Sequence, residues 1–170
     1  MNIALIGFRG TGKTTVAKLL SKKLDKKLIS TDEEVIKRIK ISMQKFVQKY
    51  SWEKFLEIES EIIENISNFD EFIFDTGDEI VIRNENVVNL KKNSFIILLT
   101  ADINTLKNRI KDSKKRPSLP KISYIDEAAN VLKERELRYK RAADYTIDTS
   151  MLPPHEICDL IIHYIEMETQ

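Results

Sequence analysis

A glycine-rich stretch near the start of the chain has the residue types and spacing that bind phosphate. Residues 7–14 read Gly-Phe-Arg-Gly-Thr-Gly-Lys-Thr, which matches the pattern G-x-x-x-x-G-K-[ST]. Glycines let the backbone curl so that its N–H groups point at phosphate oxygens, and a following helix N-terminus adds partial positive charge. Lys13 is expected to reach the β- and γ-phosphates of a nucleotide, and Thr14 to join a Mg²⁺ shell. The predicted nucleotide-binding residues are Gly10, Thr11, Gly12, Lys13, Thr14 and Thr15.

The segments on either side of this loop support that interpretation. Residues 3–6 form a short apolar run typical of a buried strand, and the residues after Lys13 have the apolar spacing of a helix. A chance glycine-rich turn is the alternative, but strand, loop and helix follow in the order that a phosphate-binding loop requires. The sequence therefore predicts that the chain binds ATP together with Mg²⁺.

A second candidate for the metal site is Asp75, which ends the apolar run at residues 72–74. A carboxylate at the end of an apolar strand is the Walker-B arrangement, in which it supports Mg²⁺ directly or through water. Alternatively, Asp75 begins a turn with Thr76 and Gly77, a common position for aspartate. Both interpretations remain open at the level of sequence.

Short apolar runs alternate with longer segments of helical spacing, which is the pattern of an α/β fold around a parallel sheet. Strands are expected at residues 3–6, 27–29, 72–74, 95–99 and 145–147. The segments between them are expected to be helices that bury an apolar stripe. The predicted stripes are Leu19, Leu20 and Leu24; Phe55, Ile58, Ile62 and Ile66; and Leu132, Leu137 and Ala142.

Composition and charge limit the partners of the chain. It has 170 residues, 42% of them hydrophobic, and a formal net charge of +1. One domain over residues 1–170 is expected, without the charge that attracts nucleic acid or an anionic membrane. No apolar stretch approaches membrane-spanning length, and the single cysteine gives no sign of an oxidising compartment. We expect a cytoplasmic monomer.

Charge is unevenly distributed along the chain. Residues 57–85 are rich in Asp and Glu, with Arg83 as their one basic residue, and such a block usually marks solvated helix faces. Residues 111–124 are basic, contain two prolines and have few apolar side chains. This second segment is expected to form a loop or lid outside the core.

Over nearly its whole length the chain resembles the shikimate kinase family. Residues 2–20 are similar to the family's opening, which contains Gly-Phe-Met-Gly-x-Gly-Lys-[Ser/Thr]. Further motifs follow in the family's order and spacing. Residues 30–32 fall at Asp-x-Asp, 54–59 at Phe-Arg-x-x-Glu, 75–79 at the Gly-Gly-Gly segment, 116–119 at Arg-Pro-Leu-Leu, and 135–139 at Arg-x-Pro-Leu-Tyr.

The resemblance implies a phosphate-loop NTPase fold with a five-stranded parallel sheet in the order 2-3-1-4-5, a lid at residues 111–124, and an acceptor pocket above the strand ends. It implies roles in aromatic amino acid biosynthesis and in phosphoryl transfer to a hydroxyl. The implied residues are Asp32, holding or deprotonating the acceptor hydroxyl; Arg116, on the transferring phosphate; Arg109, against adenine; and Gly77 and Arg135, on the acceptor.

Simpler interpretations exist for three of these residues. Asp32 is placed where it could cap the helix that begins there, because aspartate is a common N-cap. Arg109 could lie on the exposed face of an amphipathic helix, and Arg116 could be an ordinary loop charge.

The departures from the family pattern fall on the acceptor side. Leu56 stands at the family's first carboxylate-binding arginine, and Asp78 and Glu79 replace two glycines of the triplet. Losing one partner of a buried charge pair costs about 2 to 5 kcal/mol, and nearby acids add repulsion toward a carboxylate. Arg135 is retained, and Arg138 is a candidate to replace the missing charge.

Three functions therefore remain open. The first is a shikimate kinase, and the second is a kinase of the same fold for another acceptor, such as a polyol or an aminated compound. The third is a nucleotide-binding regulatory protein that has lost phosphoryl transfer. Asp32 and Arg116 favour a kinase, because a binding protein needs neither a base nor a lid arginine.

Overall fold

The computed structural model describes residues 1–112 and 125–168, in which five parallel strands form one sheet. The strand order is β2-β3-β1-β4-β5, as the resemblance implied. All five expected strands are present, each extended by one or two residues. They are β1 (Asn2–Ile6), β2 (Lys27–Ser30), β3 (Phe72–Asp75), β4 (Ser94–Thr100) and β5 (Tyr145–Asp148).

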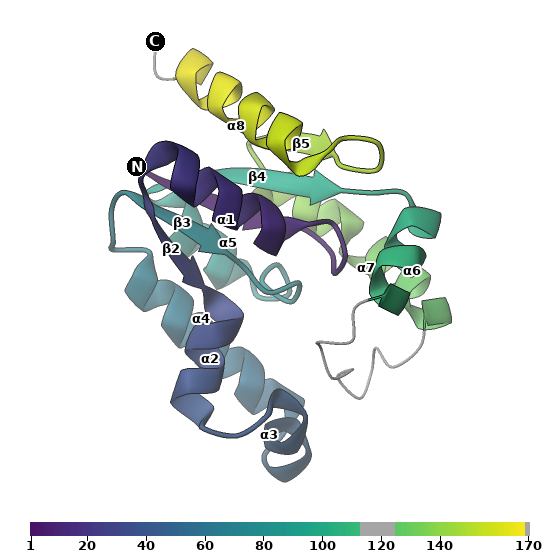
Figure 1. Ribbon diagram of the computed structural model, residues 1–170. Helices are drawn as coiled ribbons and strands as arrows, with labels where there is room; N and C mark the ends of the chain where they lie inside the picture. The colour runs from purple at the N-terminus through teal and green to yellow at the C-terminus, as the bar shows by residue number, and fades with distance from the viewer. Residues whose placement is uncertain (113–124, 169–170) are drawn as a thin grey trace.

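Helices cover both faces of the sheet (Figure 1). The helices α1 and α8 pack on one face, while α4, α5 and α7 pack on the other. The pair α2 and α3 extends beyond the sheet next to α4, and α6 lies beside α7. Their bounds are α1 (Lys13–Leu24), α2 (Thr31–Ile39), α3 (Met43–Lys49), α4 (Trp52–Ile66), α5 (Asn84–Lys91), α6 (Ile103–Asp112), α7 (Ile125–Ala142) and α8 (Pro154–Glu168).

The central strand β1 shows how the two layers are specified. Its side chains alternate between faces, since successive residues of a strand point to opposite sides. Ile3 and Leu5 pack with α1 and α8, whereas Ala4 and Ile6 pack with the α4 side, and all four are buried. Burial on both faces explains why the strands read as continuous apolar runs in the sequence.

A buried asparagine aligns β3 with β1. Asn2 donates through Nδ2 to the carbonyl of Phe69 at 2.7 Å and accepts from the N–H of Phe72 at 2.9 Å. In the resulting register Asp75 lies opposite Leu5 on one side and Ser30 on the other. The carboxyl ends of β1, β2 and β3 therefore meet at one edge, where ligands bind in open α/β sheets.

One predicted core position is wrong. Leu137 on α7 is 64% exposed. Side chains on one helix face recur every three or four residues, whereas Leu137 is five residues from both Leu132 and Ala142. Among the α7 side chains that the structure describes, the buried ones are instead Ala128, Tyr139 and Ala142.

Most of the predicted lid, including Arg116, lies outside the described residues. In the part of the chain that the structure covers, no helix combines the length and apolar character needed to cross a bilayer.

Candidate active site

The loop after β1 is tightly curled, and two of its glycines explain how. Gly7 has φ +143°, and a Cβ there would lie 2.3 Å from the carbonyl oxygen of Leu99, so no other residue fits. Gly12 has φ +96° at the N-cap of α1, in the left-handed region that glycine adopts without strain. Thr11 closes the turn through its side chain, which donates to the carbonyl of Phe8 at 2.8 Å.

Lys13 lies folded along this loop. Its Nζ donates to the carbonyls of Gly7 at 2.8 Å and Phe8 at 3.1 Å, and only 6% of the residue is exposed. The ammonium group is thus held at the loop where phosphates are expected, while Thr14 and Thr15 are exposed at the start of α1. The residues predicted to bind the nucleotide, 10–15, therefore all lie at the N-terminus of a single helix, α1.

Thr14 and Asp75 are in direct contact. The Thr14 hydroxyl donates to Asp75 Oδ2 at 2.7 Å, and Asp75 is 5% exposed at the end of β3. The structure brings together the two residues predicted to hold Mg²⁺, and their oxygens are the ligand type that Mg²⁺ prefers.

Ser30 lies opposite Asp75 in the sheet but acts as a helix cap. Its hydroxyl accepts from the N–H of Glu33 at 3.4 Å and caps α2. The alternative in which Asp32 caps this helix is therefore wrong. Asp32 lies inside the first helical turn and is 8% exposed.

Arg109 links three parts of the site edge. Its Nη1 donates to the carbonyl of Gly10 at 3.1 Å and to Thr149 Oγ1 at 3.0 Å, and its Nη2 donates to the carbonyl of Thr149 at 2.9 Å. The guanidinium thus ties α6 to the phosphate loop and to the loop after β5. It is half-buried, unlike a free residue on an exposed helix face.

Gly77 lies close to three carboxyl groups. A Cβ at this position would lie 2.7 Å from Asp32 Oδ1, 2.9 Å from Glu59 Oε1 and 3.4 Å from Glu79 Oε2. Its N–H donates to the Thr31 hydroxyl at 2.9 Å. Only glycine therefore fits here without a shift of these carboxyl groups, and its own N–H already has a partner.

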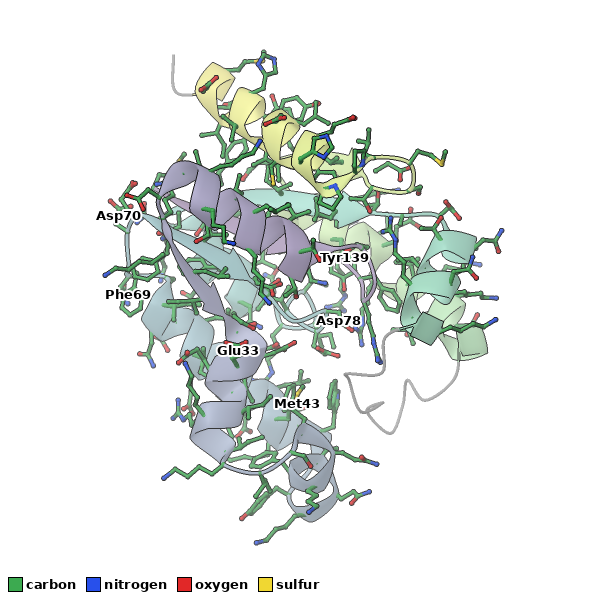
Figure 2. The ribbon with its side chains drawn as sticks, viewed as in Figure 1. Glu33, Met43, Phe69, Asp70, Asp78 and Tyr139 are labelled. Atoms are coloured by element: carbon green, nitrogen blue, oxygen red, sulfur yellow. The ribbon has the colours of Figure 1, made fainter. Side chains whose placement is uncertain are left out.

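Four carboxyl groups form what we call the acidic cluster: Asp32, Glu59, Asp78 and Glu79. Their exposed fractions are 8%, 0%, 3% and 3%. The expectation of solvated helix faces is therefore wrong for the three of them that lie in residues 57–85. Asp78 is labelled in Figure 2, near Tyr139, whose hydroxyl donates to the Asp78 carbonyl.

Burial and mutual repulsion change the acidity of this cluster. Desolvation, followed by repulsion from Glu79, Asp32 and Asp78, raises the pKa of Glu59 well above its ordinary value. Desolvation, followed by repulsion from Asp78 and Asp32, raises the pKa of Glu79 to about 8. Both effects disfavour the charged form of a carboxyl group.

Arg135 from α7 faces the acidic cluster. Its Nη1 donates to the carbonyl of Asp78 at 3.2 Å and lies 4.0 Å from both Asp78 Oδ2 and Glu79 Oε1. Arg138 does not replace the missing arginine at position 56, because it is exposed and donates to the carbonyl of Ile82. Leu56 itself is apolar and 4% exposed.

The sequence interpretation matched two residues of the site edge to the family but gave them no role. Glu59 follows Phe55 by four residues and precedes Ile62 by three, so its spacing places it on the buried face of α4. Thr149 is 1% exposed, and its hydroxyl lies 2.9 Å from the carbonyl oxygen of Thr11. Residues 147–149 belong to the resemblance to the family, but that resemblance assigned Thr149 no role, because its contact joins residues far apart in the chain.

Comparisons with known proteins agree with this arrangement. The shikimate kinase family profile matches residues 9–166. A shikimate kinase from Caldicellulosiruptor bescii is 37% identical over 161 residues, covering 95% of this chain and 93% of the relative. One from Thermodesulfovibrio yellowstonii is 36% identical over 165 residues, covering 97% and 95%. The sequence and fold define a small-molecule kinase of the nucleotide-binding α/β class. The chain belongs to the shikimate kinase family.

Solved structures share the fold. The shikimate kinase from Aquifex aeolicus superposes with a TM-score of 0.85 at 30% identity, covering 99% of this chain and 98% of that one. The shikimate kinase from Acinetobacter baumannii, solved in complex with shikimate, gives a TM-score of 0.90 at 23% identity, covering 98% and 93%. The second likeness is evidence for the fold alone.

Proposed function

We propose that the protein transfers the γ-phosphate of ATP to a hydroxyl of a small metabolite, with Mg²⁺ bound at the phosphate loop. The observation that carries this proposal is the position of Asp32. It is a nearly buried carboxyl group two residues after Ser30, which lies opposite Asp75 in the sheet. A group that can orient a hydroxyl therefore shares a strand edge with the nucleotide loop.

The nucleotide side follows from the loop. The N–H groups at residues 10–15 and the Lys13 ammonium would bind phosphate oxygens, and Lys13 would exchange its present carbonyl partners for them. Thr14 and Asp75, already 2.7 Å apart, would hold Mg²⁺, which neutralises charge on the phosphates when bound. Arg109 is proposed to lie against the adenine.

On the acceptor side, Asp32 would accept a hydrogen bond from the attacking hydroxyl and take its proton as the phosphate bond forms. Gly77 and Arg135 would contact the acceptor. The contact of Arg116 with the transferring phosphate remains a prediction from the sequence. Phosphoryl transfer mainly needs such positioning and charge neutralisation.

Shikimate is the first acceptor to test, because the relatives are named for it and Arg135 is retained. We expect no nucleic acid or membrane partner, and a monomer in the cytoplasm, as the sequence predicted.

An assay of ADP formation tests the proposal directly. Protein, ATP and Mg²⁺ are mixed with shikimate or with a panel of small polyols, and phosphorylated products are identified by mass spectrometry. Acceptor-dependent ADP formation that is lost in Asp32→Asn is the expected result. Nucleotide binding without transfer to any acceptor would instead favour the regulatory protein that lacks catalysis.

A further inference from the structure

A cavity of about 140 Å³ lies next to the phosphate loop. Its walls come from that loop, from the end of β4, and from α6 and α7, which lie beside each other (Figure 1). The deeper part of the wall includes Phe8, Leu98, Leu106 and Tyr139, each at most 2% exposed. The cavity therefore extends into the hydrophobic core.

This cavity is separate from the two parts of the active site described above. The residues that line it include neither Thr14 and Asp75 at the proposed metal position nor Asp32 and Arg135 on the acceptor side. A molecule bound there would therefore be a third ligand, in addition to ATP and the acceptor.

The opening of the cavity carries no net charge. Glu136 and Lys140 are the two exposed residues that line it, and they lie one turn apart on α7 and form an ion pair with each other. The hydroxyl groups on the wall already donate to backbone carbonyls: Thr11 to Phe8, Thr100 to Ile147, and Tyr139 to Asp78. A charged or polyhydroxylated molecule would have polar groups left unpaired here, which is unfavourable in a buried site. The cavity therefore favours a neutral, apolar occupant.

The size of the cavity indicates which apolar molecules fit. An apolar cavity of about 150 Å³ lined by Leu, Ile and Phe side chains is large enough to bind benzene. The cavity beside the phosphate loop has a similar volume, and its wall contains the rings of Phe8 and Tyr139, which favour contact with another ring. A molecule with a single aromatic ring is therefore the best match.

The walls of the cavity also support the phosphate loop. Phe8 and Thr11 belong to both. A Cβ on Gly10 would lie 3.5 Å from Leu106 Cδ2, so the wall on α6 packs against the loop as well. The carbonyl of Phe8 accepts from Lys13 Nζ at 3.1 Å. A ring packed against Phe8 stabilises this arrangement, whereas ATP is proposed to draw Lys13 away from the loop carbonyls. Because a ligand favours the state that it contacts best, the ring is expected to oppose ATP binding.

We propose that this cavity binds a small neutral molecule with one aromatic ring, and that the bound ring weakens ATP binding at the phosphate loop. The binding of the ring is independent of the proposed function, whereas its effect rests on ATP binding at that loop. The affinity for the ring is therefore measured first without nucleotide and then with it.

Benzene is the probe, and myo-inositol, a ring of the same size with a hydroxyl group on every carbon, is the polar control. Each is titrated into the protein while the amide resonances are followed by NMR. Benzene is expected to give saturable shifts with a dissociation constant of about 1 mM or below, as suits a ligand with so few atoms. No saturable shifts are expected for myo-inositol. Absence of saturable benzene binding, or equal binding of the two compounds, overturns the proposal.

Two tryptophan variants locate the site. Leu132→Trp enlarges a half-buried wall residue on α7 and is expected to weaken benzene binding by about tenfold or more. Leu137→Trp is the matched control, because Leu137 is on the same helix but 64% exposed and is not among the residues that line the cavity. Thermal melting verifies that both variants are folded. Ala101→Leu fills the cavity from the segment after β4 and replaces Leu132→Trp if that variant is unstable.

The effect on the nucleotide is measured by calorimetry with a non-hydrolysable ATP analogue and Mg²⁺, with and without saturating benzene. Benzene is expected to raise the dissociation constant of the analogue by about fivefold or more. By linkage, the analogue weakens benzene binding by the same factor. In Leu132→Trp, benzene at the same concentration is expected to leave the affinity for the analogue unchanged.

The outcomes separate this inference from the proposed function. Benzene binding that the two tryptophan variants reduce equally, or not at all, lies outside the cavity and overturns the proposal. Binding in the cavity that leaves the affinity for the analogue unchanged, or raises it, overturns the effect on ATP. If the analogue does not bind even without benzene, the proposed function fails, while benzene binding that depends on Leu132 still supports the cavity as a ligand site.

Discussion

The hydroxyl of Thr14 donates a 2.7 Å hydrogen bond to Asp75 Oδ2, which joins the first turn of α1 to the end of β3. The helix α1 follows β1 after the phosphate loop, and β1 is paired with β3 so that Leu5 lies opposite Asp75. The contact therefore joins the ends of two neighbouring strands. A threonine and a carboxylate in this position are suited to share one Mg²⁺.

The first prediction concerns this pair. Asp75→Asn keeps the shape but removes the charge that would support the metal, so the Mg²⁺ concentration needed for half-maximal activity is expected to rise by about tenfold. Titration of activity with Mg²⁺ measures it. Ser30→Ala is the control, because Ser30 caps α2, and it is expected to change the Mg²⁺ requirement little. The reverse ranking of the two variants would favour a turn-forming role for Asp75.

The second prediction concerns Lys13, which holds its ammonium over the loop carbonyls. Lys13→Ala removes the charge expected on the β- and γ-phosphates, so ATP affinity is expected to fall by about tenfold or more. Calorimetry with ATP and Mg²⁺ measures this. Lys18→Ala on the exposed side of α1 should bind ATP as the unmodified protein does. Unchanged binding and turnover in Lys13→Ala would remove the loop from the nucleotide site.

Much of the fold follows from local sequence. The loop at residues 7–14 is specified by its own glycines, and the strand at residues 72–74 by an apolar run that parallel strands need for burial on both faces. The order of the strands is different. Apolar runs do not say which strand pairs with which, so the order came from the family resemblance and is confirmed by the pairing of β1 with β3 and β4.

The burial of the acidic cluster was harder to predict from the sequence. Glutamate is seldom fully buried, so the stripe on α4 was assigned to Ile58 and its apolar neighbours and not to Glu59. The spacing from Phe55 nevertheless places Glu59 on the buried face. The approach of Asp78 and Glu79 to that face depends on the loop after β3, and no local pattern indicates where such a loop turns.

The third prediction tests Arg109, which at present binds Gly10 and Thr149. If its guanidinium lies against adenine, Arg109→Ala is expected to weaken ATP binding by about tenfold and to leave binding of inorganic tripolyphosphate unchanged. Equal loss for both ligands would show that Arg109 acts only by supporting the loop. Lys111→Ala, an exposed position on the same helix, is the control.

The fourth prediction is a dependence of stability on pH. The pKa of Glu79 is raised from 4.5 to about 8, so between these values the folded protein binds more protons than the unfolded chain. The stability that the Glu79 carboxyl contributes is fully present below its unfolded pKa of 4.5 and is lost as pH rises through its folded pKa of about 8. Burial and repulsion also raise the pKa of Glu59.

Urea denaturation at about pH 6 and about pH 9 should therefore give a smaller free energy of unfolding at the higher pH. The variant Glu79→Gln, which cannot titrate, should lose less stability over this range, and an equal loss in both proteins would contradict the assignment.

The last prediction asks whether a carboxylate clamp can be rebuilt. Leu56 is buried one turn before Glu59, so an arginine there would carry a cation toward the unpartnered carboxyl group. Replacing Asp78 and Glu79 with glycine would remove two acids that lie 4.0 Å from Arg135. The triple variant Leu56→Arg, Asp78→Gly, Glu79→Gly is expected to improve kcat/KM for shikimate by about tenfold or more, equivalent to at least ~1.4 kcal/mol.

The double variant with the two glycines alone separates relief of repulsion from the gain of a guanidinium, and thermal melting verifies that the new arginine is accommodated. If the unmodified protein already phosphorylates shikimate efficiently, the clamp argument is wrong and Arg135 alone suffices for the carboxylate. A third outcome is that neither protein uses shikimate while another alcohol is phosphorylated. The fold and the phosphoryl transfer then stand, but residues other than those at positions 56, 78 and 79 determine the acceptor, because fold alone does not determine substrate.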